Sequence, residues 1–89
     1  MEKFYNLPSK DKNFIRTIKS ETGRTQITAI RLKEHIRIDI KHNYGDYYDT
    51  DIHGKEILKN NTGYETLYSN SNSIAYALSR GKNHWRRYF

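Results

Sequence analysis

The sequence predicts a small α+β domain in which one antiparallel sheet has helices packed on one face. Three observations predict it: a helix-like pattern near the start of the chain, a long alternation of apolar and polar residues in the middle, and a second helix-like pattern near the end. With 89 residues the chain is long enough for one domain and too short for two. We therefore expect residues 1–89 to fold as a single domain.

The first expected element is an N-terminal helix over residues 9–23. Ser9 can cap its start and Gly23 is a natural stop. Phe14 and Ile18 then share one helical face. The same residues also fit the alternation of a strand, so a strand is the alternative.

The middle of the chain, residues 25–53, predicts a three-stranded antiparallel meander. Apolar side chains alternate with polar ones from Thr28 to Ile40, so they share one face. Glu34 interrupts the alternation and marks the first turn. A loop over residues 43–45 marks the second turn, because such loops place glycine in the left-handed conformation. The side chains expected to be buried are Ile30, Ile36, Ile38 and Ile40.

The other face of this meander carries a basic stripe, which could be a surface for phosphate groups. Its members are Arg31, Lys33, His35, Arg37 and Lys41. The predicted register sets Asp51 opposite Arg37 and Asp49 on the diagonal from Lys41, and cross-strand pairs of this kind attract each other. The stripe is therefore expected to be a largely neutralised, solvated face.

The last third of the chain predicts a fourth strand and a second helix. Tyr64, Thr66 and Tyr68 alternate and would lie on one side of the strand. The helix would be capped by Ser71 or Asn72. The spacing of the apolar residues predicts its buried face, and a glycine predicts its C-terminal end. These residues are Ile74, Ala75 and Leu78 for the buried face, and Gly81 for the C-terminal end.

The charge of the chain is positive and unevenly distributed. The formal net charge is +6 and the pI is about 9.6. Residues 1–35 carry +4 from eight basic and four acidic residues, residues 36–68 carry −2 from four and six, and residues 69–89 carry +4 from four and none. Positive charge of this kind favours association with polyanions such as nucleic acid.

The C-terminal segment is the main candidate for a binding site, because cations and aromatic rings are interleaved there without any acid. Guanidinium groups form forked hydrogen bonds to phosphates, and aromatic rings stack on exposed bases. For Trp85, packing over the core is the favoured role, because a small domain seldom spares its only tryptophan, and base stacking is the alternative. The residues of this candidate site are Arg80, Lys82, His84, Trp85, Arg86, Arg87 and Tyr88. A secondary basic surface is expected on the first helix, at Lys10, Lys12, Arg16 and Lys19.

Neither a metal site nor a cofactor site is expected. Asp49, Asp51 and His53 occupy alternate positions and could approach a divalent cation, but neighbouring basic residues account for the acids without a metal. The absence of cysteine rules out disulfides and thiolate zinc sites. We expect no cofactor.

The sequence favours a non-enzymatic binding protein whose partner is nucleic acid or a nucleoprotein complex. One version is an inhibitor from a phage or mobile element that blocks a host defence nucleoprotein. Two alternatives stay open: a metal-independent ribonuclease-type toxin that uses His, Arg and Tyr, and a structural or oligomeric domain, such as a homodimer. The N-terminus does not have the pattern of a signal peptide and no stretch has membrane-spanning length, so we expect a cytoplasmic protein without a membrane partner.

Overall fold

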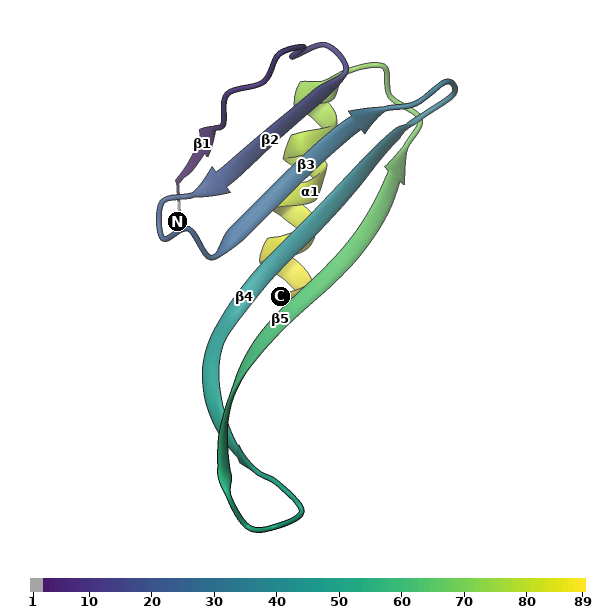
Figure 1. Cartoon of the computed structure of the whole chain (residues 1–89). Coiled ribbons are helices and arrows are strands. Elements are labelled where there is room, and N and C mark those ends of the chain that lie inside the picture. Colours follow the sequence, from purple (N-terminus) through teal and green to yellow (C-terminus); the bar gives the residue numbers. More distant parts are fainter. Residues whose placement is uncertain (1–2) are drawn as a thin grey trace.

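The computed structural model describes residues 3–89 and has a five-stranded antiparallel sheet with one helix across one face (Figure 1). The strands follow one another in the sheet in chain order. The helix, α1 (Ile74–Tyr88), packs against β2, β3 and β4. The strands are β1 (Phe4–Asn6), β2 (Ile15–Ser20), β3 (Thr25–Arg31), β4 (Ile36–Thr50) and β5 (Glu56–Ser69). The predicted helix-first α+β class is wrong, because the described chain is mostly strand.

The predicted N-terminal helix is replaced by a turn and a strand. The amides of Phe14 and Ile15 donate to the Asp11 carbonyl at 3.2 and 3.0 Å, which closes one turn and no more. The residues that follow are rich in β-branched side chains, which favour a strand over a helix. β2 then pairs with β3 so that Ile18 lies opposite Ile27, and both become buried. Burial in the sheet therefore outweighs the local helix signals.

The central meander is correct at its first turn and wrong at its second. The amide of Leu32 donates to the carbonyl of His35 at 2.8 Å, which closes the predicted turn around Glu34. β4, however, passes through Gly45 and ends at Thr50. Gly45 has the expected positive φ of 109°, but it lies in a bulge where β4 shifts its register against β5.

The buried face of the sheet follows even positions in β4 and odd positions in β3. Ile36, Ile38 and Ile40 are buried, as predicted. Ile30 is not, because β3 and β4 pair with Arg31 opposite Ile36, and every odd residue of β3 therefore shares a face with an even residue of β4. The core beneath α1 consists of Ile18, Ile27, Ala29, Ile36, Ile38, Ile40, Ile74, Ala77 and Leu78.

The C-terminal helix is present but is longer than predicted. Its N-cap is Ser73, whose Oγ accepts a hydrogen bond from the Tyr76 amide at 3.2 Å, rather than Ser71 or Asn72. The helix also continues through Gly81, so the expected tail of residues 82–89 is its second half.

The buried face of α1 matches the prediction only in part. Ile74 and Leu78 are buried as expected, whereas Ala77 takes the buried place that was predicted for Ala75. Gly81 is buried as well and faces the sheet. Glycine at this position therefore serves close packing and not helix termination.

The fourth predicted strand lies within β5 and continues into a projecting hairpin. Tyr64, Thr66 and Tyr68 pair with Lys41, Asp39 and Arg37 of β4 and lie on the face opposite α1, which we call the open face. Beyond residue 43 the hairpin of β4 and β5 leaves the rest of the sheet, and we call residues 44–61 the arm (Figure 1). The arm accounts for the elongated dimensions of 52 × 27 × 25 Å.

Within residues 3–89, no helix combines the length and the apolar character needed to cross a membrane.

Candidate functional site

The second half of α1 is basic, with four cations between residues 80 and 87. None of the 15 residues of the helix is acidic, and Arg86 and Arg87 occupy its last turn. Cations at this end stabilise the helix by interacting with its dipole, which gives the arginines a structural role in addition to any binding role. The two roles are compatible, because the side chains of both residues are exposed.

The predicted site residues divide into two groups by their position on α1. Lys82, His84 and Trp85 are half-buried on the sides of the helix that approach the sheet. The remaining ones are exposed and present three cations and one ring to the surroundings: Arg80, Arg86, Arg87 and Tyr88. The helix therefore separates residues that the sequence alone placed in one tail.

A groove of about 250 Å³ lies between α1 and Leu67 of the edge strand β5. Arg80 lies at one end, and its Nη1 donates to the Tyr68 carbonyl at 2.6 Å. This bond fixes the guanidinium group and leaves its other N–H donors for a ligand. The groove is lined by Leu67, Arg80, Asn83, His84, Arg87 and Tyr88. Asn83 was not identified from the sequence, since an isolated asparagine carries no pattern.

His84, which lines this groove, contacts an acidic side chain, that of Glu65. Its Nε2 lies 2.7 Å from Oε2 of Glu65, on β5. The contact does not have the geometry of a hydrogen bond, and Nε2 has no hydrogen-bond partner among the described residues. The two groups therefore attract each other as an ion pair when the imidazole is protonated. In that state the carboxylate charge is compensated and the groove is basic.

Trp85 packs over the core and does not face the groove. Its ring meets that of Phe4 edge to face at a centroid distance of 5.5 Å. The indole Nε1 donates to Nδ1 of His42 at 3.2 Å, and Oγ1 of Thr25 lies 2.6 Å from the same nitrogen. Because an indole N–H can only donate, Nδ1 must be the acceptor, and neutral His42 carries its proton on Nε2. These contacts give Trp85 the structural role that the sequence favours for it.

The secondary basic surface does not form one helical face. Lys10 and Lys12 lie in the loop between β1 and β2, whereas Lys19 lies on the open face of β2. Arg16 lies on the side of α1, where it lines a hollow of about 240 Å³ together with Lys82. The structure thus brings Arg16 to a residue of the main candidate site, which the predicted helix would not have done.

The predicted basic stripe does not lie on one face, because Arg31 pairs with Ile36 and lies on the side of α1. The other members have different neighbours from those predicted. Asp49 and Asp51 lie in the arm, opposite residues of β5 or in the terminal turn, and neither faces the stripe. The predicted neutralisation by these two acids is therefore wrong. Asp39 is the acid that lies among the basic residues, 3.2 Å from Nη2 of Arg37.

The Asp49, Asp51 and His53 side chains are engaged separately. Asp49 accepts a hydrogen bond from Lys59 Nζ at 3.0 Å, and this bond, with one from the Thr50 amide, holds the pKa of Asp49 below its ordinary value. Asp51 Oδ1 accepts from the amides of His53 and Lys55 in the terminal turn. Among residues 3–89 there is no group of three or more His, Cys, Asp or Glu side chains that could hold a metal ion.

The four histidines have separate surroundings. His35 meets the ring of Tyr68, His42 accepts from Trp85, and His84 pairs with Glu65. His53 lies in the terminal turn of the arm. Among residues 3–89, the contacts therefore bring together no pair of histidines arranged as the general acid and general base of a ribonuclease.

No family model, curated protein or solved structure matches this chain.

Proposed function

We propose that this protein binds nucleic acid through the outer side of α1, with Arg80, Arg86 and Arg87 on the phosphate backbone. The observation that carries the proposal is the acid-free helix whose exposed Arg80 and Arg87 line the groove, with Arg86 beside Arg87 in a neighbouring hollow. Planar guanidinium groups bind phosphate oxygens through paired hydrogen bonds, so a row of them suits a repeating phosphate ligand. A nucleoprotein complex offers the same ligand, and an inhibitor of such a complex is one form that this function can take.

The arrangement favours backbone contacts over readout of base sequence. The exposed cations lie on the convex surface of one helix, and such contacts position a protein on nucleic acid without identifying its sequence. Asn83, between Arg80 and Arg87 in the groove, adds one amide that can both donate and accept. We therefore expect binding that depends strongly on salt and weakly on sequence.

A salt titration of binding to a fluorescent oligonucleotide tests the proposal. Each phosphate contact contributes about −0.7 to −0.9 to the slope of log affinity against log salt concentration. The double variant Arg86→Gln/Arg87→Gln should make the slope shallower by about 1.4 to 1.8, which corresponds to two contacts. The charge-retaining variant Arg86→Lys/Arg87→Lys should keep most of the slope.

The matched control is Lys10→Gln/Lys33→Gln. Lys10 and Lys33 are exposed, and they lie in loops away from the last turn of α1. The control removes the same formal charge as the arginine variant. An equal change of slope in both variants would mean that net charge alone attracts the oligonucleotide, and it would contradict a site on α1. Circular dichroism melting of each variant separates lost binding from a weakened helix.

A further inference from the structure

The open face of the sheet has three tyrosines, each placed opposite a cation: Tyr5 of β1 lies opposite Lys19, and the other two lie on β5. On β5, Tyr64 lies opposite Lys41 and Tyr68 lies opposite Arg37. The Lys41 Nζ is 5.9 Å from the centroid of the Tyr64 ring. The same arrangement therefore occurs twice along β4 and β5, with the Asp39–Thr66 pair between the two.

Both rings are exposed beyond what the fold requires. Tyr64 is 72% exposed and Tyr68 is 55% exposed. The ring of Tyr68 meets His35 edge to face at a centroid distance of 5.0 Å, which steadies the ring and leaves much of it uncovered. The core lies on the other face of the sheet, so neither ring serves it.

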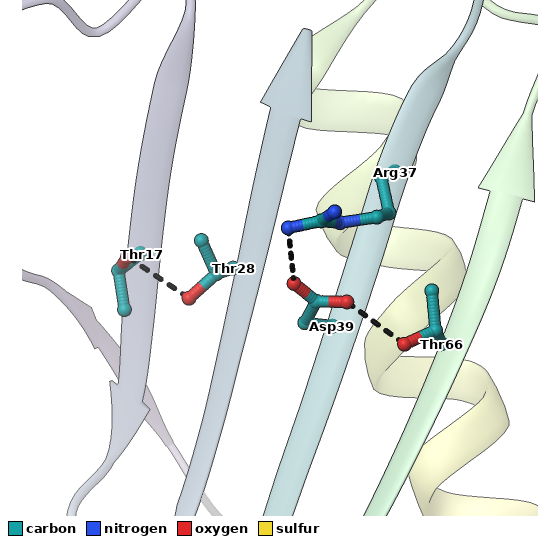
Figure 2. A network of polar contacts seen from close by, with 5 residues as sticks. All are labelled: Thr17, Thr28, Arg37, Asp39 and Thr66. Atoms are coloured by element: carbon teal, nitrogen blue, oxygen red, sulfur yellow. Dashed lines mark hydrogen bonds and ion pairs between the residues drawn. The ribbon is translucent and has the colours of Figure 1, made fainter. Parts of the chain in front are cut away.

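The acid between the two tyrosines is compensated by its neighbours. Figure 2 shows Asp39 between Arg37 and Thr66: Nη2 of Arg37 is 3.2 Å from Oδ2, and the Thr66 hydroxyl donates to Oδ1 at 2.9 Å. In the same view the hydroxyls of Thr17 and Thr28 are 3.1 Å apart and continue this polar surface across β2 and β3. With Asp39 paired, Lys41 is the cation of this surface that remains for an anionic ligand, together with Lys19 on β2.

A shallow hollow of about 270 Å³ lies beside Tyr64. Gln26 and Thr28 contribute polar groups to it from β3, and Lys41 contributes its charge from β4. Two carboxylates, Asp39 and Glu65, also line the hollow; Asp39 is paired with Arg37, and Glu65 lies beside His84. The hollow thus combines one exposed ring, one cation, two paired acids and hydrogen-bonding groups that suit the edge of a base.

We infer that the open face binds single-stranded nucleic acid, with one base stacked on Tyr64, another on Tyr68, and a phosphate near Lys41. The inference rests on the proposed function for the class of ligand, and it adds that the strand is single. Duplex bases are already stacked on one another, whereas unpaired bases can lie flat on exposed rings. Four residues of strand separate the tyrosines by roughly 13 Å, so each ring takes its own base.

The two binding surfaces meet at one edge of the sheet. β5 is an edge strand, and Arg80 of α1 binds the carbonyl of Tyr68 on that strand. A single strand on the open face can therefore continue around the β5 edge to the groove of α1. Because the open face and the groove of α1 adjoin at β5, one ligand can stack its bases on the first and place its phosphates at the second.

The test measures binding of a fluorescent thymidine 20-mer, a uridine 20-mer of the same length, and a DNA duplex. The variant Tyr64→Leu/Tyr68→Leu should weaken binding of the single strands at least about tenfold, because base stacking is lost. Its salt slope should stay that of the unmodified protein, because no phosphate contact is removed. The variant Tyr64→Phe/Tyr68→Phe keeps the rings and should bind nearly as well. Comparison of the two single strands shows whether DNA or RNA is preferred.

The arm supplies the matched control, Tyr47→Leu/Tyr48→Leu. Both tyrosines are exposed, and both lie outside the open face. This control should bind single strands as the unmodified protein does. Unchanged duplex binding by the open-face variant, with weakened single-strand binding, supports the inference.

Three outcomes overturn the inference, and they differ in what they mean for α1. If Tyr64→Leu/Tyr68→Leu binds single strands normally while Arg86→Gln/Arg87→Gln does not, the open face is not the site and the proposed function stands. If the arm control loses as much affinity as the open-face variant, the tyrosines act through general surface character. If the unmodified protein binds no oligonucleotide even at low salt, both proposals fail, and the tyrosines would then point to a protein partner.

Discussion

Gly81 of α1 lies so close to Ile38 of β4 that a Cβ atom on the glycine would be only 2.9 Å from the isoleucine Cγ2. The same atom would be 2.8 Å from Cγ2 of Ile27. Both isoleucines are fully buried, so neither has free space into which it can turn. The absence of a side chain at position 81 therefore sets how closely the helix approaches the sheet.

Gly81→Ala should destabilise the protein although alanine is the better helix former. The intrinsic preference favours alanine by about 1 kcal/mol, whereas overpacking costs about 1–3 kcal/mol. We expect a net loss of up to about 2 kcal/mol in the free energy of unfolding, measured by urea denaturation. The control Ser79→Ala changes an exposed position of the same helix and should be neutral or slightly stabilising. A more stable Gly81→Ala variant would show that the contact is looser than the structure has it.

Ile38→Ala should cost about 2–5 kcal/mol in the free energy of unfolding, since it leaves a cavity in a closed core. Ile38 is 0% exposed and lies under α1. Ile57→Ala makes the same change in the arm, where the side chain is exposed, and should cost far less. Equal losses in the two variants would contradict the division of the molecule into a packed body and an exposed arm.

Gly45→Ala should weaken the junction between the body and the arm. The φ of 109° lies in a region that residues with a Cβ rarely adopt, and the strain should cost about 1–2 kcal/mol. Hydrogen exchange monitored by NMR should show the largest loss of protection in the amides on both sides of the bulge. Thr50→Ala, an exposed change in the same strand, should leave those amides protected. Unchanged protection in Gly45→Ala would argue against the bulge.

The pair of Asp49 and Lys59 should be visible in a carboxyl NMR titration. The hydrogen bond with Lys59 is the main cause of the lowered pKa of Asp49, and Asp49 in turn raises the pKa of Lys59. Lys59→Ala should therefore raise the pKa of Asp49, while Lys55→Ala should leave it where it is. A pKa of Asp49 that does not respond to Lys59→Ala would show that the pair does not persist in solution.

The sign of the two shifts gives the pH window in which this pair contributes to stability. A lowered carboxyl pKa contributes at pH values above the range of the unfolded chain, and the contribution is lost as the pH falls through the lowered value. A raised amine pKa contributes below its unfolded range and is lost as the pH rises through the raised value. The pair therefore acts between these limits. Both groups are fully exposed, so the effect on the stability of the whole protein should be slight.

The sequence predicts those parts of the fold that depend on neighbouring residues. The alternation around Ile38 identifies a strand and its buried face, and Glu34 marks a turn because it breaks the alternation. The conformation of Gly45 is also foreseen. Its setting is not, because a bulge and a turn both need a positive φ there, and the pairing that distinguishes them involves Asn61, far along the chain.

Two predictions, the N-terminal helix and the helix stop at Gly81, are wrong for the same reason. In both, contacts between residues far apart in the sequence outweigh a local signal. The capping signal at Ser9 is real but short, and the gain from burying Ile18 against Ile27 exceeds it. Gly81 has the character of a helix stop until its contact with the sheet is known.

In the candidate site, too, the features that depend on neighbouring residues are predicted and those that depend on distant contacts are not. The basic and aromatic composition of residues 80–88 is evident from the chain alone, and so is the packing role of Trp85, the single tryptophan. Tyr64 and Tyr68 were correctly placed on one side of a strand. Their pairing with Lys41 and Arg37 depends on the register of β4 and β5, which the misplaced second turn concealed.

The arm also makes the charge distribution of the molecule asymmetric. Residues 44–61 contain four acids and two lysines and carry a net charge of −2. The rest of the chain carries +8, which gives the total of +6. These opposite charges lie toward the two ends of a molecule that is 52 Å long, which gives the protein a dipole moment along its long axis. In the field of a polyanion the protein turns so that its basic body leads and the arm points outward, before any contact forms. On the proposed function, Ile52 at the tip, 94% exposed, lies on the side of the molecule away from the nucleic acid.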